Sequence, residues 1–154
     1  MPDVFTRAKR SLVMSRIRGE GNRTTELQMM ALLRSHRIRG WRRGQRLFGK
    51  PDFVFRQERV VLFVDGCFWH GCPKPKHAPP PKSRAEWWAA KLGRNKMRDQ
   101  EVTVALRSRR WLVIRVWECD LAPQTCNKIA QKIARALASR PRRVDGRRHG
   151  AGNR

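Results

Sequence analysis

Acidic residues are scarce in this chain. Only 12 Asp and Glu stand against 36 Lys and Arg in 154 residues, so the formal net charge at pH 7 is +24. An excess this large exceeds what solubility requires and favours binding to a polyanion. Six Trp and six Phe accompany the basic residues, and aromatic rings can stack on bases while cations contact phosphates. The composition therefore predicts a nucleic-acid partner.

Long hydrophobic runs are also missing. No segment reaches the roughly 18 apolar residues that a membrane-spanning helix needs. Charged residues interrupt the first 18 residues, which argues against a secretory signal. We therefore expect a cytoplasmic protein that does not bind a membrane. In that reducing compartment cysteines are expected to be metal ligands or inert thiols rather than disulfides, and the chain has four: Cys67, Cys72, Cys119 and Cys126.

The length suits one domain with a single hydrophobic core. We expect this domain over residues 1–138. Residues 139–154 are rich in arginine and almost free of apolar side chains, which predicts a disordered basic tail.

Hydrophobic periodicity predicts an α/β fold. In chain order the elements are a helix of about 12 residues from Thr24, strands at 52–55 and 60–64, a helix from about Arg84 to Arg109, a strand at 111–117 and a last helix around 129–137. A polar turn joins the first two strands into an antiparallel hairpin, and a helical crossover makes the second and third strands parallel. The result is a small mixed sheet flanked by helices.

Two carboxylates are expected at one end of this sheet. Asp52 begins the first strand of the hairpin and Asp65 follows the second, so antiparallel pairing brings them together. Two carboxylates with several waters suit Mg²⁺. A Pro-Asp pair followed about a dozen residues later by an acid is also the pattern of the PD-(D/E)xK nuclease core. That pattern has a lysine where this chain has Cys67. His70 lies close behind and could accept a proton from a metal-bound water, or it could instead bind zinc.

Three cysteines are predicted to meet at the same end. Four residues separate Cys67 from Cys72, and Cys119 follows the strand expected beside residues 60–64. Three thiolates and one imidazole would complete a tetrahedral Zn²⁺ site. His77 is favoured as the fourth ligand because it belongs to the same proline-rich segment as Cys72. His70 and Cys126 are the alternatives, and buried thiols without metal are another.

Aromatic residues surround these polar groups. Phe68 and Trp69 follow the second strand, and Trp88 lies near the start of the long helix. Side chains of this kind can wedge between base pairs, although Trp88 also fits the core stripe of its helix. Glu26, near the start of the first helix, fits a favourable interaction with the helix dipole.

Four sequence blocks resemble the very short patch repair (Vsr) endonucleases, bacterial enzymes that nick DNA at T:G mismatches left by deamination of 5-methylcytosine. The blocks are 15–19 with 25–26, 49–53, 64–72, and 95–99 followed by 116–119, and together they span about residues 10 to 120. The resemblance implies a type II restriction-endonuclease-like fold, a structural zinc and Mg²⁺-dependent cleavage on the 5′ side of the mismatched thymine.

The resemblance also implies roles for single residues. It makes Asp52 the metal-binding aspartate, His70 the candidate general base and Glu26 an outer metal contact through water. Asp99 matches the acid that supports the active-site imidazole in members with histidine at the position of Asp65, and Phe68, Trp69 and Trp88 match the intercalating aromatics. Asp65 stands where some members have an imidazole, which favours direct contact between Asp65 and Mg²⁺.

The expected partner is double-stranded DNA with a T:G mismatch. The resemblance adds a MutL-type mismatch-repair ATPase as a further partner. We expect a monomer, because a single nick needs only one active site. Two other functions stay open at this point: a nuclease of the same fold without mismatch selectivity, and a zinc-stabilised DNA-binding module without catalysis.

Overall fold

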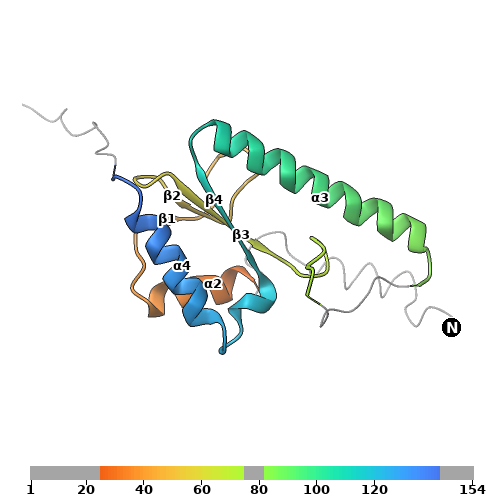
Figure 1. The fold of residues 1–154 in the computed structure, drawn as a ribbon, viewed down its shortest axis with the longest axis horizontal. Helices are drawn as coiled ribbons and strands as arrows, with labels where there is room; N and C mark the ends of the chain where they lie inside the picture. Colours follow the sequence, from red (N-terminus) through yellow and green to blue (C-terminus); the bar gives the residue numbers. More distant parts are fainter. Residues whose placement is uncertain (1–24, 75–81, 143–154) are drawn as a thin grey trace, which may run out of the picture.

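The computed structural model describes residues 25–74 and 82–142, which form a four-stranded sheet covered by helices on both faces (Figure 1). The elements are α2 (Glu26–Ser35), β1 (Trp41–Arg42), β2 (Phe53–Phe55), β3 (Val60–Asp65), α3 (Ala85–Ser108), β4 (Leu112–Trp117), the 3-10 helix η1 (Glu118–Leu121) and α4 (Cys126–Ala138). Among the described residues, no helix combines the length and the hydrophobicity that crossing a membrane requires.

The sheet has the order β1-β2-β3-β4. Strand β2 pairs antiparallel with β1 and with β3, whereas β3 pairs in parallel with β4 over six residues. Helix α3 is the crossover between the two parallel strands. The hairpin and the parallel pair that the sequence predicts are therefore confirmed. The edge strand β1 is an addition, because two residues are too few to show a period.

The central strand β3 is buried over its whole length, as its apolar sequence predicts. Successive side chains of a strand point to opposite faces of the sheet. Val60, Leu62 and Val64 therefore join the cluster formed with α2 and α4, whereas Val61 and Phe63 join the cluster formed with α3. Because Asp65 continues the second series, the alternation also assigns its carboxylate to the α3 face.

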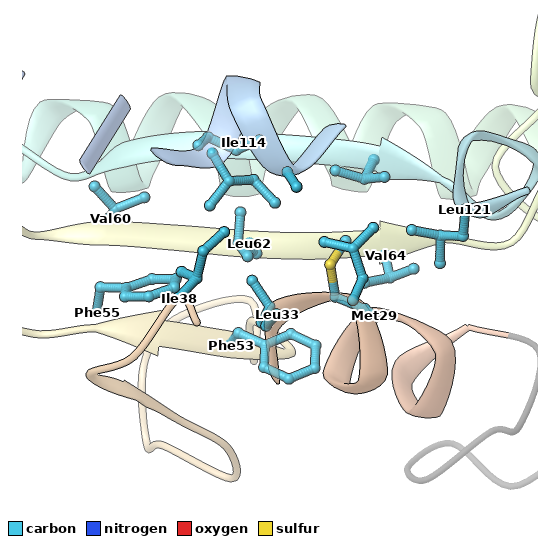
Figure 2. Close-up of a cluster of buried hydrophobic side chains, with 14 residues drawn as sticks. Met29, Leu33, Ile38, Phe53, Phe55, Val60, Leu62, Val64, Ile114 and Leu121 are labelled. Carbon is cyan, nitrogen blue, oxygen red and sulfur yellow. The ribbon is translucent and has the colours of Figure 1, made fainter. Parts of the chain in front are cut away.

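The larger cluster lies between the sheet and the helices α2 and α4 (Figure 2). Met29 and Leu33 of α2 are fully buried there, and so are Phe53 and Leu62 of the sheet. Each such side chain contributes about 1.5–3 kcal/mol through its burial. The core thus fixes the strands whose ends carry the polar residues.

Helix α3 uses only its C-terminal half for the core. Val102 and Leu106 pack against the sheet, whereas Trp88 and Leu92, which the pattern predicts as part of the same stripe, are not buried. The N-terminal half of α3 reaches beyond the end of β3 (Figure 1). There Trp88 packs against other aromatic rings.

A glycine brings the loop before β2 close to α3. Gly49 has a φ of +78°, and a Cβ atom there would lie 2.2 Å from a methyl carbon of Val102. Only glycine allows this approach without strain. The close contact sets the position of the chain that leads into Asp52.

Candidate functional site

One cavity gathers most of the polar residues that the sequence singles out. Its volume is about 400 Å³, and it opens at the end of β3. Its lining includes the carboxylates Glu26, Asp52, Asp65 and Asp99, the cations Lys50, Arg98 and Arg115, and the rings of Trp69 and His70. They come from α2, the loop before β2, the sheet, the turn after β3, and α3, so this site depends on the complete fold.

Asp52 and Asp65 both face the α3 side of the sheet. The β2–β3 register pairs Phe53 with Leu62, and extending it by one residue sets Asp52 opposite Phe63, two residues before Asp65. The Val64 N–H donates to Oδ2 of Asp52 at 2.7 Å. The predicted approach of the two carboxylates is therefore confirmed as a shared position on one cavity wall.

Burial makes the ionised form of Asp52 costly. Loss of hydration raises the pKa of Asp52 to about 6, despite the hydrogen bond from the Val64 N–H, and the nearby carboxylates Glu26 and Asp65 add to the rise. Burial also raises the pKa of Asp65, although the Arg115 guanidinium opposes this effect. A bound cation would relieve both costs.

Glu26 lies at the start of α2, as expected, and it is also buried beside Asp52 on the cavity wall. Its carboxylate forms an ion pair with Arg43 from the loop after β1. The helix dipole is therefore not the only favourable interaction of Glu26. The position agrees with an outer contact to an ion held at Asp52.

His70 and Asp99 form a hydrogen-bonded pair across the cavity. The Nδ1 atom of His70, in the turn after β3, lies 2.6 Å from Oδ2 of Asp99 on α3. An ionised carboxylate only accepts hydrogen bonds, so we assign the proton to Nδ1, which leaves a lone pair on Nε2. Asn95 of α3 donates to the carbonyl of Trp69 at 3.0 Å and fixes the same turn. Two contacts with α3 thus hold His70 and its turn in place.

Arg115 is the charged residue of β4, and the sequence analysis did not single it out. Its Nη1 atom donates to both oxygens of Asp65, at 2.8 and 2.9 Å. It also approaches Oδ1 of Asp99 at 3.4 Å. A lone arginine inside an otherwise apolar strand is the signal that could have revealed it.

Three thiols meet next to this cavity. The sulfur atoms of Cys67, Cys72 and Cys119 all lie within 4.8 Å of one another, as predicted, and they form the only group among the described residues with at least three His, Cys, Asp or Glu side chains close enough to share a metal ion. Burial raises the pKa of Cys67 to about 12, and the neighbouring thiols add to this. Ionised sulfur there requires a cation, and three thiolates are the ligands that Zn²⁺ prefers.

Two of the three candidates for the fourth zinc ligand have other partners. His70 is engaged by Asp99, and Cys126 contacts Pro123 and Asn127 at the start of α4, outside the thiol group. His77 lies outside the described residues and stays a prediction.

The three predicted aromatic side chains form one cluster. The ring of Phe68 lies 5.0 Å from that of Trp69 and 5.3 Å from that of Trp88. Lys91, one turn further along α3, places its ammonium group 5.3 Å from the ring of Trp69 and 4.9 Å from that of Trp87. Trp87, which is 48% exposed, extends the cluster to the surface. Trp69 borders both the cluster and the cavity.

Comparison with known proteins relates this arrangement to one family. A family model described as "DNA mismatch endonuclease Vsr" matches residues 2–74. The chain is 38% identical to a type II nicking enzyme of Xanthomonas oryzae over 79% of this chain and 88% of that protein. It is 34% identical to a type II nicking enzyme of Neisseria meningitidis over 89% and 97%, respectively.

A further relative is the DNA mismatch endonuclease Vsr of Escherichia coli, which is 36% identical over 79% of this chain and 76% of its own length. Identity of this extent is spread over most of each relative rather than confined to one motif. The chain therefore belongs to the DNA mismatch endonuclease Vsr family.

Proposed function

We propose that this protein is a Mg²⁺-dependent endonuclease that nicks double-stranded DNA on the 5′ side of the thymine in T:G mismatches. Family membership supports the endonuclease activity, and relatives are named as nicking or mismatch enzymes. One observation carries the proposal: two carboxylates and an oriented imidazole line a single cavity that an aromatic cluster borders. The net charge of +24 supports a polyanionic substrate.

The Mg²⁺ ion would be held by Asp52 and Asp65, with Glu26 in contact through water. Among the described residues, the hydrogen bond that Asp52 accepts engages Oδ2, and none engages Oδ1. Within residues 25–74 and 82–142, no third carboxylate comes close enough to complete a three-ligand group, which suits Mg²⁺ because this ion keeps several waters. When bound, the ion would polarise the scissile phosphate and lower the pKa of a coordinated water.

His70 would act as the general base. Its Nε2 atom carries the lone pair, because Nδ1 donates to Asp99. The imidazole would accept the proton that the attacking water loses, while Asp99 holds the ring in this tautomer. Both residues are fixed by α3, whose Asn95 holds the turn after β3. The pair supplies what the lysine of the PD-(D/E)xK pattern does elsewhere, and we propose that nuclease core for this fold.

A structural Zn²⁺ would be held by Cys67, Cys72 and Cys119 with His77. It would tie the turn after β3, which carries Cys67 and Cys72, to η1, which carries Cys119. A tetrahedral site of this kind contributes to folding and not to the reaction. His70 then remains available for proton transfer.

The aromatic cluster would select the mismatch. Phe68, Trp69 and Trp88 would insert beside the T:G pair, which costs less to distort than a Watson–Crick pair. We further propose that the chain acts as a cytoplasmic monomer with one domain over residues 1–138. The basic tail predicted over 139–154 is not disordered from its start, because Arg140 donates to the Arg110 carbonyl and Arg142 forms an ion pair with Glu58. A MutL-type ATPase is a proposed partner.

The test is a strand-resolved nicking assay on paired duplexes that differ only by T:G or C:G within a cytosine-methylation site, first with Mg²⁺ and then with EDTA. We expect one nick beside the thymine of the T:G duplex, only with Mg²⁺, and none with Asp52→Asn. Equal cutting of both duplexes would replace the proposal by a nuclease without mismatch selectivity. Tight binding without any cutting, unchanged by Asp52→Asn, would indicate a binding module.

A further inference from the structure

Arg115 joins the two halves of the site. Its neighbours on β4 are apolar, and its side chain extends over the ring of Phe63, with the guanidinium carbon 4.4 Å from the ring centre. Every guanidinium nitrogen has a partner: Nη1 donates to both Asp65 oxygens, Nε to the hydroxyl of Thr103 at 3.3 Å, and Nη2 to the carbonyl of Asp99 at 3.3 Å. The guanidinium is therefore committed to the protein, with few donors left for a phosphate.

The contacts of Arg115 lead directly to the imidazole. Asp99 presents Oδ1 to Arg115 at 3.4 Å and Oδ2 to Nδ1 of His70 at 2.6 Å. A single carboxylate thus holds both groups. Asp65, the other partner of Arg115, lies 3.8 Å from the same imidazole nitrogen. A shift of the guanidinium would move a carboxylate of β3 and a carboxylate of α3 together.

We propose that Arg115 is a positioning residue for the nicking reaction, acting through Asp99 on His70 and directly on Asp65. The inference rests on the proposed function and deepens it. Cys67, at the lysine position of the nuclease pattern, belongs to the thiol group, and Arg115 supplies a cation to the same end of the sheet from the neighbouring strand. A guanidinium does not give up its proton in proteins, so Arg115 orients and neutralises while proton acceptance stays with His70.

The first variant is Arg115→Lys, which keeps the charge but loses the planar group whose Nη1, Nε and Nη2 atoms bind Asp65, Thr103 and the Asp99 carbonyl at once. We expect kcat to fall about 10- to 100-fold, because a misplaced reacting group costs rate at this scale. KM and the DNA affinity in EDTA should stay within about threefold, since Arg115 makes no DNA contact in this scheme. The control is Arg107→Lys, the same substitution at an exposed arginine in the last turn of α3.

Two readouts separate positioning from general stability, and all assays run well below the lowest melting temperature. Asp99→Asn combined with Arg115→Lys should lose no more than about threefold beyond Asp99→Asn alone, because residues that act as one unit are not additive. In protein that keeps its zinc but lacks Mg²⁺, NMR should show the Nδ1 proton of His70 as a sharp resonance in the wild type and in Arg107→Lys, and broadened by exchange in Arg115→Lys.

The outcomes are distinguishable. A kcat for Arg115→Lys within about threefold of the wild type, or a raised KM at unchanged kcat, would overturn the role of Arg115. The role would also be overturned if the kcat losses of the two single variants multiply in the double variant. An unchanged His70 resonance in Arg115→Lys would overturn it as well. A wild type that cuts no duplex refutes the proposed function instead, and the NMR comparison then still tests whether Arg115 positions His70.

Discussion

Replacing Asp52 by asparagine should abolish nicking and yet stabilise the Mg²⁺-free protein at neutral pH. Burial raises the pKa of Asp52 from 3.8 to about 6, so ionisation of this carboxyl group costs more free energy in the folded protein than in the unfolded chain. Asparagine retains an oxygen for the hydrogen bond from the Val64 N–H but carries no charge. In the absence of Mg²⁺, the substitution therefore removes the cost of a buried charge and keeps the hydrogen bond from the Val64 N–H.

The size of the effect follows from linkage between protonation and folding. The difference between 3.8 and about 6 corresponds to at most about 3 kcal/mol. Because the pKa of Asp52 is raised in the folded state, its contribution to wild-type stability is greatest below about pH 4 and is lost as the pH rises through about 6. The advantage of Asp52→Asn should therefore be near zero in acid and reach its full value above about pH 7.

Denaturant titrations in EDTA at about pH 4 and about pH 7.5 measure this difference, which corresponds to roughly 5 to 10 °C in melting temperature. Adding Mg²⁺ should stabilise the wild type but not Asp52→Asn, because only the wild type binds the ion tightly. Glu101→Gln, at an exposed acid on α3, is the matched control and should change nothing. If Asp52→Asn is less stable than the wild type at neutral pH in EDTA, the burial argument is wrong.

Two further predictions concern the thiols and the aromatic cluster. Cys119→Ser should reduce the zinc content from about one ion per chain and lower the melting temperature, because the proposed zinc site would tie the turn after β3 to η1. Atomic absorption and calorimetry measure the two effects, and an unchanged zinc content would mean that other ligands suffice. Trp69→Ala should reduce the ratio of T:G to C:G nicking about tenfold, because base stacking on the indole is lost; an unchanged ratio would exclude Trp69 from mismatch selection.

The sequence predicts the centre of this fold better than its edge. Strand β3 is apolar on both faces, and this pattern is sufficient to place it inside the sheet. The long helix between β3 and β4 predicts their parallel pairing through the handedness of such connections. Strand β1 could not be predicted, since its two residues pair with β2 only because the hairpin is already in place.

Local patterns also predict the carboxylates and the thiols of the site. Asp52 and Asp65 flank a hairpin, so their approach follows from the antiparallel pairing alone. Arg115 could not be paired with Asp65 in this way, because 50 residues separate them and their contact depends on the parallel register of β3 and β4. The partner of Glu26, Arg43, comes from a loop without a periodic pattern. Contacts between distant residues are what the sequence alone does not specify.

The arginines explain why a metal ion is expected at one particular carboxylate. Arg115 neutralises Asp65 and approaches Asp99, and Arg43 forms an ion pair with Glu26. The hydrogen bond that Asp52 accepts within the described residues comes from the Val64 N–H, and burial raises the pKa of Asp52 further than this hydrogen bond and the Arg43 guanidinium lower it. On the cavity wall, as far as the structure describes it, Asp52 is thus the carboxylate whose charge is least compensated. In the proposed site, that difference would favour Asp52 as the first ligand of Mg²⁺, with Asp65 as the second.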